Sequence, residues 1–214
     1  EQIMDFRMFH ITVSLPSGRS ETLSLPHLST LRDLKVLAQN SFGQGFLKLA
    51  TEGGHVLTDL TDSLEASGIQ DGDHFTAVVQ QPKVVATNKA FAVWCCGGDG
   101  IVTWGNPDSG GDSSAVQDQL MSLQQVVGGS AAFAAILGEG SVVTWGDLLH
   151  GGDSSPVQDQ LRDVKQVQAT GCAFAAILGD GSVVTWGDPN SGGDSSPVQD
   201  QLRDVKQVQA TKSP

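Results

Sequence analysis

Three loops of this sequence carry aspartate and asparagine at short, alternate spacing, a pattern that hard cations such as Ca²⁺ accept as oxygen ligands. The three sets are Asn106, Asp108 and Asp112; Asp147 and Asp153; and Asp188, Asn190 and Asp194. The second set lacks the middle ligand, and none of the sets is followed by a late bidentate glutamate. Aspartate, asparagine, glycine and serine are also the ordinary residues of turns. The loops are therefore predicted to be turns without a metal ion.

Cysteine and histidine offer the other route to chemistry. A Cys/His nucleophile would use Cys95 or Cys96, but the only histidine in the C-terminal part is His150, one repeat later, and no third group stands ready to orient it. Cys172 occupies an alanine position of a repeat (GCAFAA beside SAAFAA), which indicates a small buried hydrophobe. No CxxC or Cys/His pair has zinc-ligand spacing. We therefore predict no catalytic residue, no cofactor and no metal.

Charge, hydropathy and cysteine count limit the classes of partner and the cellular locations that we expect for this chain. The formal net charge is −12, and a surface of that sign repels phosphate backbones, so nucleic acid is not an expected partner. No apolar window of about 18 residues exists, so no membrane span is expected. Three cysteines do not make a disulfide framework and favour a reducing compartment, hence an intracellular location, cytoplasmic or nuclear. The start, EQIMDFRMFH, is not a secretory signal and lacks an initial Met, which predicts a fragment or a processed chain.

The elements that carry these loops repeat. The twenty residues GGDSSPVQDQLRDVKQVQAT occupy 151–170 and recur unchanged at 192–211. Trp104, Trp145 and Trp186 mark three units spaced by 41 residues, and a fourth unit starts with VQAT and stops. A period of this length is the signature of an array of small structural units.

Each unit is predicted to be β-structure. AFAAILGDGSVVTWG in the third unit places two apolar runs around Asp180–Gly181, a strong hairpin signal, and the other units have Glu139–Gly140 and Asp99–Gly100 there. VKQVQAT alternates polar and apolar residues, which favours a further strand. One small sheet per unit, stacked on its neighbours, is how a propeller or a β-solenoid buries a core. The exposed strands at the ends of such a stack invite self-association.

The order of apolar strand, acidic-Gly turn and S-V-V-T-W-G resembles the repeat of the regulator of chromosome condensation (RCC) family over residues 84–214. The resemblance implies propeller blades, of which that family's complete propeller has seven. Ala90, Ala132 and Ala173 stand where the family's blades carry His, and SGGDSS or HGGDSS replaces its Gly-Gln-Leu-Gly turn. Propellers need about four to eight blades. The sequence therefore predicts an all-β repeat domain, a partial β-propeller of about three short blades.

The first 80 residues do not repeat, and they mix helix and strand. FHITVSLPSGRSETLSL predicts a hairpin that turns at PSG, and LSTLRDLKVLAQNSFG predicts a helix capped by Ser29 or Thr30. The inner stripe of this helix is predicted to be Leu31, Leu34 and Val36 or Leu37. FLKLATEGGHVLTD then predicts a strand, a Gly-Gly turn and a short strand. A last strand is predicted at 74–80. In one interpretation its His74 is a neighbour of His10 on a paired strand, but the favoured interpretation is that both are ordinary surface histidines.

This ββαββ order, ending in SLEASGIQDGDHFTAVV, resembles the ubiquitin-like fold, an α+β β-grasp, over nearly the whole segment. Ubiquitin ends in a free Gly-Gly that is activated for conjugation, whereas here the last strand continues into QQPKVV, so the resemblance implies a built-in module. The family's binding patch has an exposed isoleucine at the position of Lys48, Val78 matches a second patch position, and Pro16 stands near the third.

These observations divide the chain into an N-terminal tail (1–7), a ubiquitin-like domain (8–80), a linker (81–84) and three 41-residue repeats plus a stub (85–214). The expected function is a non-enzymatic protein–protein interaction module, with Lys48, Val78, Asp153 and Asp194 on its partner-binding surface. Its partners are expected to be proteins, including components of the ubiquitin pathway, and further copies of itself. The alternatives are a piece of a large HECT-type ubiquitin ligase whose catalytic domain lies outside this chain, and a propeller that exchanges guanine nucleotides.

Overall fold

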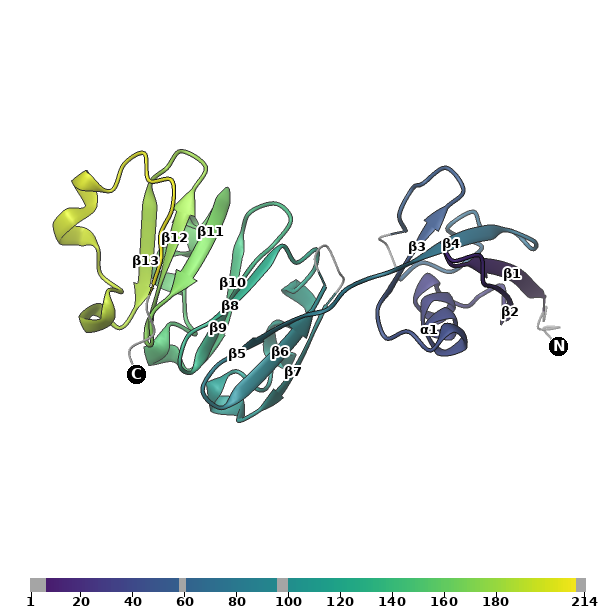
Figure 1. Cartoon of the computed structure of the whole chain (residues 1–214), viewed down its shortest axis with the longest axis horizontal. Coiled ribbons are helices and arrows are strands. Elements are labelled where there is room, and N and C mark those ends of the chain that lie inside the picture. The colour runs from purple at the N-terminus through teal and green to yellow at the C-terminus, as the bar shows by residue number, and fades with distance from the viewer. Residues whose placement is uncertain (1–6, 58–60, 96–99, 211–214) are drawn as a thin grey trace, which may run out of the picture. The chain divides into compact units, whose positions relative to one another are not determined.

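A computed structural model of the chain describes residues 7–57, 61–95 and 100–210 (Figure 1). The chain divides into two compact units, residues 1–81 and 82–214. Strand β5 begins at Lys83, so Lys83 and Val84, which fall in the expected linker, are its first two residues. Val84 and Val85 pair there with Val93 and Ala92, and this pairing extends the sheet up to the boundary.

The first unit is one mixed sheet and one helix. The elements are β1 (Met8–Ser14), β2 (Ser20–Pro26), α1 (Leu31–Phe42), β3 (Leu47–Thr51) and β4 (His74–Val79). The sheet order is β2-β1-β4-β3, with β1 parallel to β4 and the other pairs antiparallel. Within the described residues, the short strand expected after the Gly-Gly turn amounts to one bridge between Ala50 and Val56, and positions 58 and 59 of the expected strand lie outside them.

Helix α1 begins where the sequence provides a cap. The Thr30 hydroxyl accepts from the Asp33 N–H, and the Asp33 carboxylate accepts from the Thr30 N–H, so Thr30 and not Ser29 closes a capping box. Leu31 and Leu34 are buried against the sheet, as expected. Of the two alternatives for the next position, Leu37 packs against the core and Val36 is exposed, and the buried stripe continues through Ala38 and Phe42.

The pairing of β1 with β4 decides between the two interpretations of His10 and His74. Thr12, not His10, lies opposite His74 in the parallel register. The backbone N–H of Gly72 donates to the His10 carbonyl, so His10 lies beside the turn that precedes β4. The two imidazoles are therefore not a cross-strand pair.

The second unit consists of three antiparallel sheets, ordered β5-β6-β7, β10-β9-β8 and β11-β12-β13. Their strands are β5 (Lys83–Ala86), β6 (Ala90–Trp94), β7 (Ile101–Gly105), β8 (Gln125–Gly128), β9 (Ala132–Ile136), β10 (Val142–Gly146), β11 (Val164–Ala169), β12 (Ala173–Leu178) and β13 (Val183–Gly187). Two short 3₁₀ helices follow each sheet: η1 (Pro107–Ser109) and η2 (Ser114–Gln119), η3 (Leu148–His150) and η4 (Ser155–Gln160), and η5 (Pro189–Ser191) and η6 (Ser196–Gln201).

The hairpins turn where the acidic-Gly pairs predict. Gly140 and Gly181 have φ values of 83° and 83°, a left-handed conformation that glycine adopts without steric cost. The corresponding pair of the first repeat includes Asp99, which lies outside the described residues. Cys96 lies outside them as well.

The three sheets stack with apolar side chains between them. The joint between the first two sheets includes Ala92, Trp94, Phe133 and Trp145, and the joint between the second and third includes Ala134, Ile136, Phe174 and Trp186. The first strands β5, β8 and β11 contact one another in succession. Each sheet keeps two open edges, and the described residues form no closed ring of sheets.

The duplicated twenty residues do not fold alike in their two positions. In the first copy, 164–169 is strand β11, paired with β12. In the second copy, 205–210 forms no strand. Its Val205 N–H donates to Gly181 O at 2.9 Å, as the Val164 N–H donates to Gly140 O at 2.9 Å. The second copy therefore starts along the same path and lacks a strand to pair with.

Candidate partner-binding surfaces

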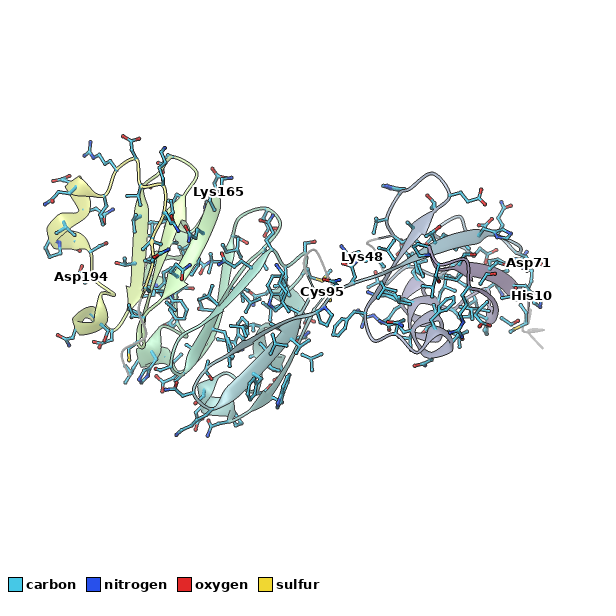
Figure 2. All side chains as sticks on the ribbon, in the orientation of Figure 1. His10, Lys48, Asp71, Cys95, Lys165 and Asp194 are labelled. Carbon is cyan, nitrogen blue, oxygen red and sulfur yellow. The ribbon has the colours of Figure 1, made fainter. Side chains whose placement is uncertain are left out.

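Lys48 and Val78, which the sequence placed on a common binding patch, lie side by side in the first unit. Lys48 on β3 pairs directly with Val78 on β4 in the antiparallel register. Lys48 is half-buried and Val78 is exposed (Figure 2 labels Lys48). Their flanking residues Leu47, Leu49 and Ala77 are buried, because side chains alternate across a sheet. The outer face of this edge therefore carries a cation beside a branched apolar side chain.

At the other end of the same sheet, Asp71 holds His10 (Figure 2). One carboxylate oxygen of Asp71 accepts from the His10 backbone N–H at 2.6 Å and lies 3.2 Å from its Nδ1. These hydrogen bonds lower the pKa of Asp71. Both side chains are exposed, so the pair closes a surface turn and offers no enclosed site.

Asp153 and Asp194, the loop residues expected on a binding surface, hold turns. The Asp153 carboxylate accepts from the Ser155 N–H at 2.9 Å, and the Asp194 carboxylate accepts from the N–H and the hydroxyl of Ser196. The side chains of Ser155 and Ser196, and then their backbone N–H groups, lower the pKa of Asp153 and of Asp194 respectively. Both residues are exposed, and Figure 2 labels Asp194. Among the described residues, no three His, Cys, Asp or Glu side chains gather closely enough to hold a metal ion.

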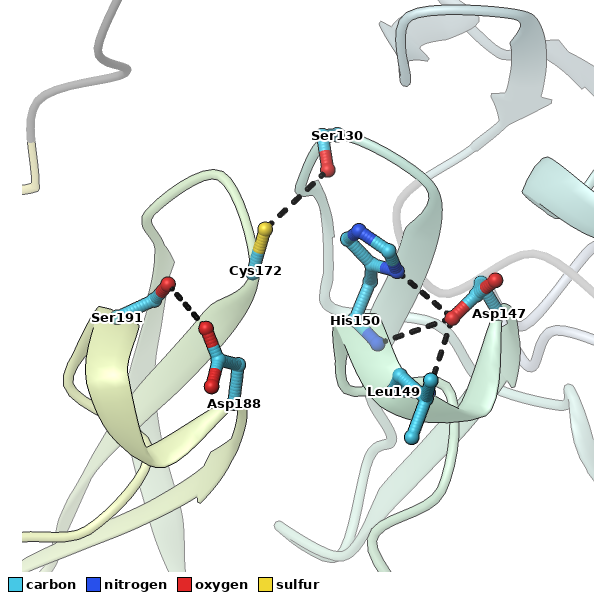
Figure 3. Close-up of polar contacts among 7 residues, drawn as sticks. All are labelled: Ser130, Asp147, Leu149, His150, Cys172, Asp188 and Ser191. Carbon is cyan, nitrogen blue, oxygen red and sulfur yellow. Dashed lines mark hydrogen bonds and ion pairs between the residues drawn. The ribbon is translucent and has the colours of Figure 1, made fainter.

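A shallow groove between the second and third sheets contains His150, Cys172 and Asp188 (Figure 3). The His150 ring lies 2.7 Å from the Asp147 carboxylate, which lowers the pKa of Asp147. The Cys172 sulfur lies 3.9 Å from the Ser130 hydroxyl and is half-buried, so it is not the fully buried hydrophobe that the sequence indicated. Asp188 accepts from Ser191. The groove thus contains the imidazole of His150, which pairs with Asp147, and the thiol of Cys172, which lies next to Ser130 instead.

The structure adds a surface that the sequence analysis did not single out. Val84, Phe91, Val102 and Trp104 lie on one side of the first sheet and are all exposed; we call this side the open face. Phe91 and Trp104 are each 46% exposed, and their rings stack 5.3 Å apart. The corresponding pairs in the inner sheets are covered: Phe133 and Trp145 are 0% and 5% exposed, and Phe174 and Trp186 are 1% and 3% exposed.

Each buried phenylalanine–tryptophan pair is covered by a glycine turn of the preceding repeat. The Trp145 indole N–H donates to Gly110 O at 3.0 Å, and the Trp186 indole N–H donates to Gly151 O at 3.1 Å. A Cβ on Gly110 would lie 2.5 Å from the Phe133 ring, so only glycine fits this close approach. The first sheet follows no such turn in sequence. The alignment of the repeats could have predicted the open face, because the first 41-residue repeat has no earlier repeat to cover it.

Comparisons with known proteins match the first unit. A ubiquitin from Caldiarchaeum subterraneum is 19% identical, with a TM-score of 0.32, and covers 35% of this chain and 96% of its own. The ubiquitin-like domain of Plasmodium falciparum Dsk2 is 20% identical, with a TM-score of 0.31, and covers 34% of this chain and 97% of its own. The sheet order β2-β1-β4-β3 of this unit, with β1 parallel to β4 and one helix packed on the sheet, is that of a ubiquitin-like fold.

No protein-family model matches the chain, and the search of curated proteins gives no match. The second unit is a set of small antiparallel sheets. Among the described residues, no helix is long and apolar enough to cross a membrane.

Proposed function

We propose that this chain is a non-enzymatic protein–protein interaction module, in which a built-in ubiquitin-like domain recognises one protein and the stacked repeats present surfaces to others. The main support is the way the domain ends. Strand β4 ends at Val79 and β5 begins at Lys83, so the end of the ubiquitin-like fold is joined to a folded unit. A terminus held in this way suits recognition by contact and not conjugation to another protein.

The outer face of β3 and β4 is the proposed recognition surface of this domain. Lys48 and Val78 face the same side as a cross-strand pair, and Val79 next to them is also exposed. A partner that suits this edge combines an apolar contact for valine with an acidic group for the Lys48 ammonium, because a charge next to a desolvated contact needs a counter-charge. Components of the ubiquitin pathway that expect an isoleucine at this position would bind the present surface weakly.

Substituting Lys48 by isoleucine tests this proposal. We expect the Lys48→Ile chain to bind a ubiquitin-associated domain more tightly than the native chain, because an apolar side chain joins Val78 and an unpaired ammonium is removed. The readout is the chemical-shift perturbation of ¹⁵N-labelled full chain titrated with that domain. Thr22→Ile, on the outer face of β2 at the opposite edge of the sheet, is the matched control. Equal binding by the two variants would refute the assignment of the surface.

The second candidate is a non-catalytic part of a HECT-type ubiquitin ligase. It is favoured by the combination of a ubiquitin-like fold with repeats that end in Trp-Gly and resemble RCC-type blades, which we propose to be a partial propeller. Transfer of ubiquitin from a charged E2 to this chain is the test. Both candidates predict no thioester on Cys95, Cys96 or Cys172, and a ubiquitin adduct that hydroxylamine cleaves would overturn the non-enzymatic assignment. Exchange of guanine nucleotides is the weaker alternative, because three units supply less than a propeller ring.

The location that we propose is intracellular, cytoplasmic or nuclear. The sequence has three cysteines, too few for a disulfide framework, and the half-buried Cys172 is a free thiol. Thiols persist in this state where glutathione keeps them reduced.

A further inference from the structure

The repeat stack has one face and one turn that are complementary to each other and lie at opposite ends. The open face carries the stacked Phe91–Trp104 pair, and the Trp104 indole N–H has no hydrogen-bond acceptor among the described residues. In the third repeat, Gly192 occupies the position that Gly110 and Gly151 have in the first two repeats. Its φ of 97° is left-handed, as theirs are. A Cβ on Gly192 would meet nothing within 4 Å, whereas on Gly151 it would lie 2.5 Å from the Phe174 ring.

We propose that a second copy of this chain docks head-to-tail, so that the Gly192 turn of one copy covers the open face of the next. The Trp104 indole N–H then donates to the Gly192 carbonyl of the other copy, and the Phe91 ring packs under that glycine. Both inner joints of the chain already show this arrangement, with indole-to-carbonyl distances of 3.0 and 3.1 Å. The proposal makes the self-association in the proposed function specific, and it does not depend on the partner of the ubiquitin-like domain.

Repetition of sequence explains why the two surfaces fit. The turn and the 3₁₀ helix that follow Gly151 are identical in sequence to those that follow Gly192, since residues 151–170 and 192–211 are the same. The open face has the same residue types as the covered ones, with Val84, Phe91, Val102 and Trp104 corresponding to Val167, Phe174, Val184 and Trp186. A face of this kind with a central tryptophan is typical of the buried centre of a protein interface.

One segment must move for the copies to dock. Residues 205–210 lie where β5 of an incoming copy would go, because they correspond to strand β11 of the inner joint. This segment forms no strand, and half of its residues are exposed. Val205 donates to Gly181 O, and Val208 O accepts from the Gln166 amide at 3.3 Å. Docking therefore releases 205–210, and the segment competes with the second copy.

Light scattering on the full chain over a range of concentrations is the first test. We expect the native chain to associate as concentration rises, and we expect Val102→Glu to remain monomeric, because it buries a carboxylate at the centre of the joint. Val102 is 58% exposed, so this change leaves the fold of the monomer intact. Leu149→Ser is the matched control, since Leu149 is exposed outside the open face. A native chain that stays monomeric throughout, or a Val102→Glu chain that associates normally, overturns the proposal.

Mixing two variants tests the polarity of the contact. Gly192→Asn places a side chain where the Phe91 ring should pack, in space that is empty in the monomer, and asparagine tolerates a positive φ. This variant keeps its open face, whereas Val102→Glu keeps its Gly192 turn. We expect each variant to be monomeric alone and their mixture to form dimers and nothing longer, because each dimer retains only damaged ends. Failure of the mixture to dimerise refutes a head-to-tail contact.

Deletion of residues 205–214 tests the competing segment. We expect the truncated chain to associate at lower concentration than the native chain, and hydrogen exchange at 205–210 to speed up as the native chain associates. An unchanged or weaker association after truncation refutes the proposed displacement. The chemical-shift titration of Lys48→Ile reports on the ubiquitin-like domain alone, so failure of the two proposals can be told apart.

Discussion

The same substitution in three equivalent turns measures how the sheets of this chain fit together. Gly110, Gly151 and Gly192 have φ values of 87°, 89° and 97°, so alanine imposes the same left-handed backbone at each, costing about 1–2 kcal/mol. At Gly110 and Gly151 the added Cβ would also lie 2.5 Å from a phenylalanine ring carbon, whereas at Gly192 it would meet nothing within 4 Å. Overpacking of this kind costs a further ~1–3 kcal/mol.

We therefore expect Gly151→Ala and Gly110→Ala to lower the free energy of unfolding of the repeat unit by about 2–5 kcal/mol, and Gly192→Ala by about 1–2 kcal/mol. Tryptophan fluorescence during urea unfolding is a suitable readout, because all four tryptophans lie in the repeat unit. The sample must be dilute, so that docking of a second copy does not cover Gly192. Equal losses at Gly151 and Gly192 would refute the argument that the inner turns are wedged against aromatic rings.

Two further predictions concern local hydrogen bonds. Thr30→Ala should destabilise the ubiquitin-like unit by about 1 kcal/mol in thermal unfolding followed by circular dichroism, because it removes the helix cap, and Ser29→Ala should have little effect; an equal effect would mean that the cap is not at Thr30. The lowered pKa of Asp194 stabilises the fold above its ordinary value of 3.8, and this contribution is lost as pH falls through the lower folded value. Asp194→Asn should therefore make the urea midpoint of the repeat unit less sensitive to acid, and an unchanged acid response would contradict this role of the carboxylate.

Several elements were predictable because short-range chemistry decides them. The cap at Thr30 needs only the next three residues, and the hairpins at Gly140 and Gly181 need only a residue that accepts positive φ. The ubiquitin-like fold followed from the order of its elements and from a helix with one apolar stripe. The same stripe left Val36 and Leu37 as alternatives, because two adjacent apolar residues on its border do not reveal which of them faces the sheet.

The binding surfaces needed the tertiary structure. That Lys48 and Val78 lie opposite each other depends on the register of β3 and β4, which are separated by more than twenty residues of loop. The phenylalanine–tryptophan pair is buried in the second and third repeats and exposed in the first repeat, although the residue types are the same. The exposed fraction of a side chain depends on its neighbours in space, whereas a repeat pattern gives only the identity of the residue.

The duplicated twenty residues show this division most directly. The sequence by itself determined their turn, their 3₁₀ helix and their alternation of polar and apolar side chains, and both copies keep the first two features. Only the tertiary structure decided that VKQVQA is strand β11 at 164–169 and no strand at 205–210. A strand is completed by backbone hydrogen bonds to a neighbouring strand. The first copy has β12 as that neighbour, and the second has none among the described residues.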